Sequence, residues 1–304
     1  MDHQYTIEQT VSTKGIGLHS GVTVKLRLVP APPDTGIVFK RVDLEGFPIE
    51  AKGQNVARVS YATSLMKKGV LISTVEHLLS AFAALKVDNA FVEIDNLELP
   101  IMDGSSLPFV ELIGQAGLRR QRTHRTFARI LKPVEVAEGG KRIRIVPANN
   151  FQITYKIAFK HPLIGEQALS FEEDAERYRK EIAPARTFGF IDEVEMLRKS
   201  GLVRGGSLEN AIVLTSDGVM NPEGLRFPDE FCRHKILDLI GDLSLLGYPL
   251  IGHVIADRAG HAMHFALVDR LLREKSAWET VRTSLVEPAQ SHPEATVSVS
   301  SPAP

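Results

Sequence analysis

The sequence predicts an α+β fold made of two similar domains, each a β-sheet layer with packed helices, with the active site between them. Three observations lead to this prediction. Strand patterns precede helix patterns in each half of the 304-residue chain; a strand, a V-P-A turn and a second strand around residues 29–31 recur around residues 146–148; and each half has an apolar helix with a histidine near its start. This self-similarity indicates an internal duplication, and the order of elements is not that of a doubly wound α/β sheet.

The composition is that of a globular protein and argues against several classes of function. Hydrophobic residues make up 43% and charged residues 24%, with a formal net charge of -1. Because no basic stripe is present, nucleic acid is not an expected partner. The single cysteine, Cys232, cannot form an internal disulfide, which is typical of a reducing compartment. No apolar run is long enough to span a bilayer and no signal core begins the chain, so we expect a cytoplasmic protein without stable membrane insertion. We also expect a monomer.

The first domain is expected to cover residues 1–122. It begins with the strands of GVTVKLRLVPAPPDTGIVFKRVD, continues through YATSL around Thr63 into an apolar helix that carries His77, and then forms the apolar strand AFVEI. The charged stretch RRQRTHR, residues 119–125, is the expected connector between the domains.

The second domain, residues 126–279, repeats this order with one long insertion. GKRIRIVPANNFQITYKIAFKH supplies the strands, ARTFGF contains Thr187, and a second apolar helix carries His234 before the strand LIGHVIA. His234 follows Thr187 by 47 residues, whereas His77 follows Thr63 by 14. The second half therefore contains a segment that the first half lacks.

The inserted segment, about residues 190–222, has the pattern of a short amphipathic helix, a Gly-rich turn and an apolar strand. Because it has its own secondary structure and precedes the histidine helix, we expect a lid or a wall of the substrate site. A neutral surface elaboration is the alternative. Residues 280–304 are rich in Pro, Ser and Ala and are expected to be disordered.

The helix predicted for residues 230–247 carries three polar residues on one stripe. His234, Asp238 and Asp242 follow one another at intervals of four in an otherwise apolar sequence. Burial of such groups costs several kcal/mol unless a partner compensates, and His77 on the equivalent helix can be that partner. His77, His234 and Asp238 then offer two imidazoles and one carboxylate, which leaves a coordination position for water, as a catalytic zinc ion requires.

The residues alone leave several interpretations open. The same ligands suit non-haem iron(II), so they do not distinguish a hydrolase from an oxygenase. A binding module with a structural metal is a third possibility, although such a site uses four protein ligands and only three are found. Glu76 and Ser73 have the spacing of a helix capping box. Equally, Glu76 stands next to His77, where a base could deprotonate a metal-bound water.

Longer motifs resemble one family of enzymes. The strings KGIGLHSG, ISTVEHLLSAFAAL, LPIMDGSSLPFV, ARTFGF, GLRFPDEFCRHKILDLIGDL and AGHA occur in the order and spacing of the UDP-3-O-acyl-N-acetylglucosamine deacetylases, the zinc enzymes of bacterial lipid A synthesis. The resemblance covers residues 3 to about 279. It implies a UDP-linked acylated amino sugar as substrate and one catalytic Zn²⁺, with Fe²⁺ as the alternative ion in the cell.

The resemblance also implies a role for individual positions. The zinc ligands of the family match His77, His234 and Asp238. Its catalytic groups match Glu76, His261, Asp242, Lys235 and Thr187. Of these, Glu76 is the general base, His261 is the general acid or electrostatic stabiliser, and Asp242 keeps His261 oriented and cationic. Lys235 and Thr187 stabilise the developing oxyanion. The implied reaction is metal-assisted hydrolysis of the N-acetyl amide to acetate and a free amine.

Substrate contacts follow from the same resemblance. The inserted segment corresponds to the passage for the fatty acyl chain, and its apolar residues include Met196, Leu197, Leu202 and Val213. The nucleotide contacts, an aromatic surface for uracil and a cation for the diphosphate, correspond to Phe159, Phe190 and Lys141. No family role is implied for three further histidines, which are expected to be structural: His161, His253 and His264. His19 lies in a motif near the active site, where a turn-stabilising role fits equally well.

Overall fold

The first sheet consists of β2 (Val11–Ile16), β3 (Thr23–Pro30), β4 (Ile37–Arg41), β5 (Phe47–Glu50) and β9 (Ala90–Ile94). In the computed structural model, which describes residues 3–282, the strand order is β2-β3-β9-β4-β5. Neighbouring strands are antiparallel except β9 and β4, which are parallel. Buried and exposed residues alternate along β3, as expected for a sheet with one face on a core.

The second sheet consists of β11 (Thr126–Ile130), β12 (Val134–Glu138), β13 (Lys141–Val146), β14 (Phe151–Ala158), β15 (Glu166–Glu172), β18 (Leu250–Asp257) and β19 (Trp278–Arg282). Its pairings include the succession β12-β13-β18-β14-β15, in which only β18 and β14 are parallel. This is the order and direction of strands in the first sheet. The match supports the predicted duplication.

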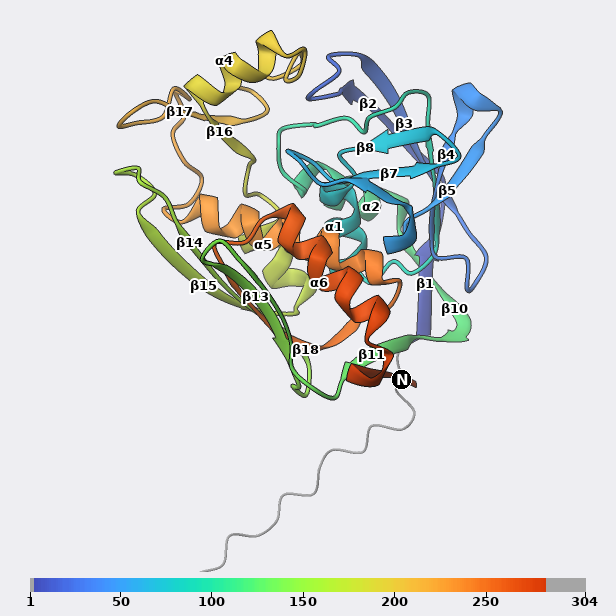
Figure 1. The fold of residues 1–304 in the computed structure, drawn as a ribbon. Coiled ribbons are helices and arrows are strands. Elements are labelled where there is room, and N and C mark those ends of the chain that lie inside the picture. The colour runs from blue at the N-terminus through green and yellow to red at the C-terminus, as the bar shows by residue number, and fades with distance from the viewer. Residues whose placement is uncertain (1–2, 283–304) are drawn as a thin grey trace, which may run out of the picture.

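Helices from both halves lie between the two sheets (Figure 1): α1 (Glu76–Ala84), α5 (Glu230–Leu243) and α6 (His261–Arg273). α2 (Leu107–Ala116) packs on α1 and β2. A side chain on Gly241 would collide with the carbonyl oxygen of Glu76, so α1 and α5 approach this closely only because residue 241 is a glycine. The buried side chains of both halves join in one hydrophobic cluster.

Smaller elements complete the described chain. Two small sheets are formed by β1 (His3–Ile7) with β10 (Leu118–His124), and by β6 (Val56–Arg58), β7 (Ser64–Lys67) and β8 (Val70–Ser73). The short α3 (Ala175–Arg177) continues into a π-helical turn (Tyr178–Ile182). The 3-10 turns are Val42–Leu44, Gly53–Asn55, Ser244–Leu246 and Lys275–Ala277. The connector expected at residues 119–125 is thus largely a strand, β10, paired with β1.

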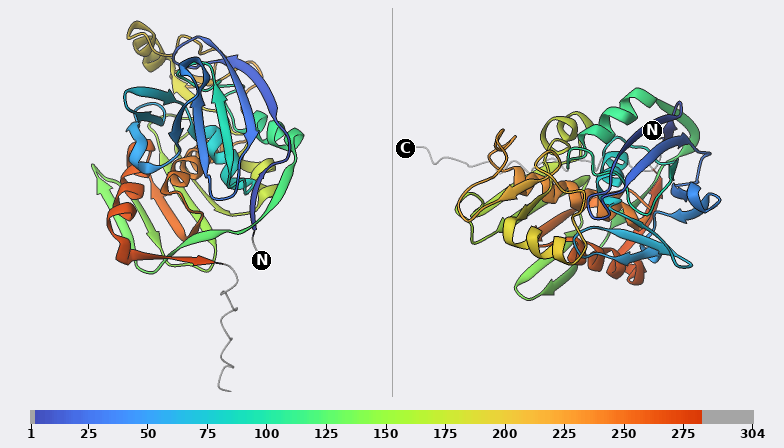
Figure 2. Two further views of the ribbon diagram at one scale, coloured as in Figure 1. Left: turned by 90° about the vertical axis from the view of Figure 1, so that its right-hand side faces the viewer. Right: turned by 90° about the horizontal axis from the view of Figure 1, so that it is seen from above.

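The inserted segment contains the predicted helix and strand. α4 (Ile191–Lys199) is followed by β17 (Ile212–Leu214), which pairs in parallel with β16 (Phe188–Phe190). In the left view of Figure 2, α4 protrudes at one end of the molecule. Residues 280–282 belong to β19, so the second sheet extends into the segment that was expected to be disordered. The remainder of that segment, 283–304, lies outside the described residues.

The α+β prediction is confirmed by these mixed sheets and helices. None of the described helices is both long enough and apolar enough to cross a membrane.

Candidate metal centre and active site

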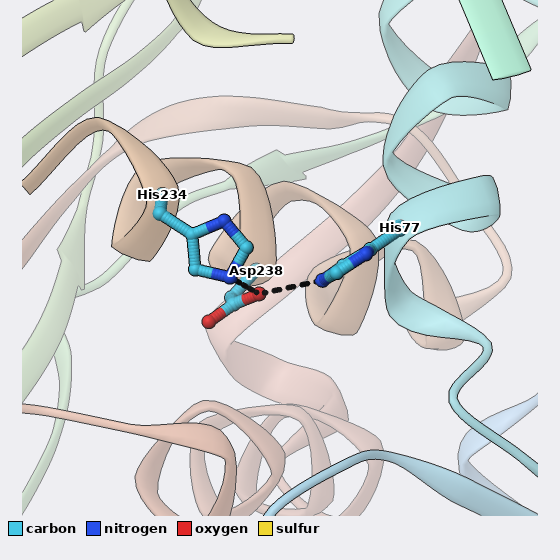
Figure 3. Close-up of side chains that lie close together, drawn as sticks. All are labelled: His77, His234 and Asp238. Atoms are coloured by element: carbon cyan, nitrogen blue, oxygen red, sulfur yellow. Dashed lines mark ion pairs between the residues drawn. The ribbon is translucent and has the colours of Figure 1, made fainter. Parts of the chain in front are cut away.

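Three buried side chains from two helices converge between the sheets (Figure 3). His77 lies in the first turn of α1, and His234 and Asp238 lie one turn apart on α5. Asp238 Oδ1 is 3.3 Å from His234 Nε2 and 3.7 Å from His77 Nε2. The three ligand-type atoms lie within 4.8 Å of one another. The structure therefore brings together the three residues predicted to hold a metal.

The hydrogen bonds around these residues leave their facing atoms available for an ion. His234 Nδ1 is 3.0 Å from the carbonyl oxygen of Ala185, so Nδ1 carries the proton and Nε2 turns its lone pair toward Asp238. Burial lowers the pKa of His234 to about 3 despite the attraction of Asp238, which keeps the imidazole neutral. Lys235 donates to Asp238 Oδ2 at 2.7 Å, but the buried Oδ1 has no hydrogen-bond partner among the described residues. This donor set fits a divalent metal ion.

Glu76 is the first residue of α1, and its carboxyl group is buried beside the metal-ligand group. Its Oε2 accepts the backbone N–H of Thr63 at 3.0 Å, and Oε1 lies 4.0 Å from His261 Nε2. The capping-box interpretation is wrong. Glu76 is the first residue of α1, not the third, the Ser73 hydroxyl bonds Ser64 instead, and no side chain within residues 3–282 caps the helix. Burial raises the pKa of Glu76, partly opposed by the charge of His261. A raised pKa suits a base that works near neutral pH.

His261 begins α6 and is joined to the third residue of the α5 stripe. Its Nδ1 lies 2.7 Å from Asp242 Oδ2, and its Nε2 faces Glu76 and Asp238. Burial alone would lower the pKa of His261, but the negative charges of Asp242, Asp238 and Glu76 raise it to about 9. Burial alone would also raise the pKa of Asp242. The charge of His261 and the hydrogen bonds that the Asp242 carboxylate accepts lower this pKa to about 2. The pair is therefore an imidazolium and a carboxylate at neutral pH.

Two further residues form hydrogen bonds with Asp242, and neither was predicted from the sequence to belong to the site. Thr63 Oγ1 donates to Asp242 Oδ1 at 2.6 Å, and His264 Nδ1 lies 2.8 Å from Asp242 Oδ2. Thr63 served only as a landmark of the duplication, and His264 was expected to be structural. The interval of three residues between His261 and His264, one turn of helix, was the available signal. Asp242, His261 and His264 also group as possible metal ligands, but the distances between them are those of hydrogen bonds.

The segment before α5 supports both a metal ligand and a candidate oxyanion group. Ala185 orients His234, and the backbone of Thr187 donates to the carbonyl of Gly104 at 2.8 Å. Between them, Arg186 is 2% exposed and forms an ion pair with Glu230, which is 0% exposed, at 2.9 Å. This buried ion pair anchors the segment to the first turn of α5.

Aromatic side chains extend from the metal-ligand group toward the inserted segment. The ring of Phe188 lies 6.4 Å from that of His234 and 5.9 Å from that of Phe159. Phe159 is 5.9 Å from Phe190, whose ring is in turn 5.8 Å from His161. The two predicted aromatic nucleotide contacts are therefore neighbours. Phe188, which sequence reasoning passed over, lies between them and the metal group.

The remaining predicted contacts are more scattered. Lys141 is exposed at the start of β13, in register with Glu138, and no described interaction links it to the metal-ligand group. In the inserted segment Met196 is 55% exposed and Val213 is buried, while Leu197 and Leu202 are half-buried.

Two histidines have contacts outside the metal-ligand group. The backbone N–H of His19 donates to Glu98 at 2.8 Å, in a turn that also contacts the inserted segment through Leu18 and Gly205. His253 bonds Thr154 on the second sheet at 2.9 Å.

Comparison with known proteins identifies the family. Residues 4–273 match the family model of UDP-3-O-acyl N-acetylglycosamine deacetylase. The chain is 55% identical to the UDP-3-O-acyl-N-acetylglucosamine deacetylase of Solibacter usitatus over 92% of this chain and 95% of the relative. It is 48% identical to the enzyme of that name from Myxococcus xanthus, over 92% and 89%, and 45% identical to that of Syntrophotalea carbinolica, over 93% and 92%. The chain therefore belongs to the UDP-3-O-acyl-N-acetylglucosamine deacetylase family.

Proposed function

We propose that the protein hydrolyses the N-acetyl amide of UDP-3-O-acyl-N-acetylglucosamine with one zinc ion held by His77, His234 and Asp238. Its family supports the reaction, which yields acetate and UDP-3-O-acyl-glucosamine in an early step of lipid A biosynthesis. The observation that carries the metal assignment is the buried, unpartnered Oδ1 of Asp238 facing two imidazole Nε2 atoms. Iron(II) accepts the same ligands and is the alternative ion.

The proton transfers are assigned to Glu76 and His261. When bound, zinc would supply a Lewis acid that lowers the pKa of water and polarises the amide carbonyl. Glu76 takes a proton from the attacking water, whose oxygen forms the new C–O bond. His261 Nε2 gives a proton to the amide nitrogen as the C–N bond breaks. Because the two groups are 4.0 Å apart, both can reach one tetrahedral carbon.

Charge on the tetrahedral oxygen is assigned to Lys235 and Thr187. Lys235 Nζ is already directed at the metal group by its 2.7 Å hydrogen bond to Asp238. The half-buried Thr187 follows Arg186, whose buried ion pair restricts the movement of its neighbours. A cation and a hydroxyl held in this way need little reorganisation when negative charge develops.

Substrate binding is assigned to the aromatic residues and the inserted segment. Phe159 and Phe190, which contact each other, form with Phe188 beside Phe159 an apolar surface suited to uracil. Lys141 is proposed to meet the diphosphate. The acyl chain is proposed to contact Met196, Leu197, Leu202 and Val213.

The organisation of the whole protein is part of the proposal. The domains are 1–122 and 126–279, related by duplication, as the matched strand orders support. We assign the protein to the cytoplasm as a monomer, which agrees with the free, buried Cys232. Light scattering of the purified protein tests the oligomeric state.

The experiment that tests the function measures acetate release and free-amine formation from UDP-3-O-acyl-N-acetylglucosamine. Metal-free protein should be inactive, and addition of one equivalent of zinc or iron(II) should restore turnover and identify the better ion. Acetate release by metal-free protein would overturn the mechanism.

A further inference from the structure

We propose that His264, supported by Tyr155, is a positioning residue for His261, and that it acts by fixing the carboxylate of Asp242 to which both histidines are hydrogen-bonded. The inference rests on the proposed role of His261 as proton donor. His264 lies one turn beyond His261 on α6 and is 0% exposed. It is too deeply buried to meet the substrate, so any effect on the reaction must pass through its neighbours.

Asp242 is held by three donors from two parts of the chain. Oδ2 lies 2.7 Å from His261 Nδ1 and 2.8 Å from His264 Nδ1, while Oδ1 accepts from Thr63 Oγ1 at 2.6 Å. The terminal torsion of an aspartate has a broad energy minimum, so one donor does not fix the plane of its carboxylate. With donors on both oxygens, the plane is fixed even when one of the bonds weakens.

The ring of His264 is itself held from its other side. Its Nε2 lies 2.9 Å from the hydroxyl of Tyr155 on β14, and that hydroxyl is also 2.9 Å from the carbonyl oxygen of Ala259. Since the carboxylate of Asp242 can only accept, Nδ1 of His264 carries a proton. Nε2 of the neutral ring and the carbonyl oxygen of Ala259 then share the single hydrogen of the Tyr155 hydroxyl. Burial lowers the pKa of His264 and raises that of Tyr155, which keeps the ring neutral and the phenol protonated.

The two histidines on Asp242 thus differ in what happens to them during turnover. His261 gives up a proton, so its attraction to Asp242 changes within each cycle, with Glu76 on α1 and Asp238 on α5 as the other charged groups facing it. His264 exchanges no proton and stays bonded to the same oxygen. It therefore holds Asp242 in place while His261 is uncharged, so that His261 returns to the same orientation when it is protonated again.

The test compares two substitutions of His264 in the zinc-loaded enzyme. His264→Leu removes the donor and should lower kcat about 10- to 100-fold, the usual effect of losing an outer hydrogen bond to a functional group, with KM and metal content unchanged. His264→Asn places an amide N–H near the position of Nδ1 and should recover most of kcat. His253→Leu is the matched control, because in the described part of the chain the His253 side chain bonds Thr154, outside the group formed by Asp242, His261 and His264. Its kcat should equal that of the wild type.

A double variant separates this inference from the proposed function. If His264 acts through His261, adding His264→Leu to His261→Ala should cause no further loss of kcat. Three results would each overturn the inference. The kcat of His264→Leu could be unchanged, His264→Asn could be as slow as His264→Leu, or the double variant could lose more kcat than His261→Ala alone. If His264→Leu does not fold, Tyr155→Phe, alone and combined with His261→Ala, provides the comparison of kcat values. A fully active His261→Ala enzyme would refute the proposed function as well. If His261→Ala is inactive but His264→Leu and Tyr155→Phe have the kcat of the wild type, only the positioning role is refuted.

Discussion

Glu76 at the start of α1 and His261 at the start of α6 bring Oε1 and Nε2 to 4.0 Å from each other. Burial raises the pKa of the Glu76 carboxyl. In His261, the surrounding carboxylates outweigh the effect of burial and raise the pKa to about 9. A buried carboxyl group and a protonated imidazole therefore face each other beside the metal-ligand group, and we propose them as the proton acceptor and the proton donor. Amide hydrolysis requires both at one carbon atom, because water must lose a proton and the leaving nitrogen must gain one.

Glu76→Gln should separate catalysis from stability. The amide oxygen can still accept the N–H of Thr63, but the side chain cannot take a proton from water. We expect turnover to fall about 100- to 10,000-fold, while metal content stays normal and the free energy of unfolding changes by less than about 1.5 kcal/mol. Initial rates, elemental analysis and denaturant unfolding measure the three quantities. An active, zinc-loaded Gln variant would show that Glu76 is not the base.

The alkaline limb of the pH profile should report His261. Because the acid must be protonated, kcat/KM should fall as the pH rises through the pKa of His261, about 9. Asp242→Asn removes a negative charge that raises this pKa, so the alkaline limb should move to lower pH. Because metal, base and acid form one coupled site, the shift of the limb is more informative than its absolute position. If the limb stays in place in Asp242→Asn, the assigned role of Asp242 is wrong.

Loss of a metal ligand should differ from loss of a proton carrier. His234→Ala and Asp238→Ala should be purified with little metal, because either change leaves only two of the three ligands. His261→Ala should retain the metal and lose turnover. A chelator should inactivate the wild type, and added zinc should restore it. Equal metal loss in all three variants, measured by elemental analysis, would mean that ligands and proton carriers have been confused.

The inserted segment should determine the response to the acyl chain. Each methylene removed from a buried acyl chain should weaken binding by about 0.8 kcal/mol, or about fourfold in Kd. Met196→Asp should weaken binding of the long-chain substrate more than that of a short-chain analogue. Met66→Asp is the control, at a similarly exposed methionine on β7. It should change the binding of neither the long-chain substrate nor the short-chain analogue. If the Kd does not change with the length of the acyl chain, the inserted segment does not bind that chain.

The buried ion pair before α5 should be important for stability. Arg186→Met leaves Glu230 charged, buried and without its main partner, so we expect a loss of about 3–5 kcal/mol in the free energy of unfolding. Replacing both residues with Met should recover much of this loss, since no buried charge is then left unpaired; Glu223, the other carboxylate that pairs with Arg186, is 55% exposed. Arg270→Met, which breaks the exposed pair with Glu274, should cost at most about 1 kcal/mol. Denaturant unfolding distinguishes these outcomes, and similar losses in the two single variants would contradict the prediction.

Four features could be predicted from the amino-acid sequence: the α+β class, the family, the inserted helix and strand, and the three side chains that meet at the metal-ligand group. These follow from local properties: strand and helix periodicity, the four-residue spacing of His234 and Asp238, and motifs in a characteristic order. Even the approach of His77 could be predicted, because the two halves repeat the same elements. The catalytic and binding roles assigned to individual residues stay predictions.

Tertiary structure alone decided which groups these side chains contact. From its spacing Glu76 could be a helix cap or a base, and the structure shows that it accepts the N–H of Thr63. His264 was expected to be structural, and the structure shows that its partner is Asp242 Oδ2, which it shares with His261. Such contacts depend on how closely two helices pack and on the rotation of each helix about its axis. Residue spacing along one helix determines neither the distance between helices nor their rotation. Here α1 can approach α5 because residue 241 is a glycine, with no side chain to collide with the Glu76 carbonyl.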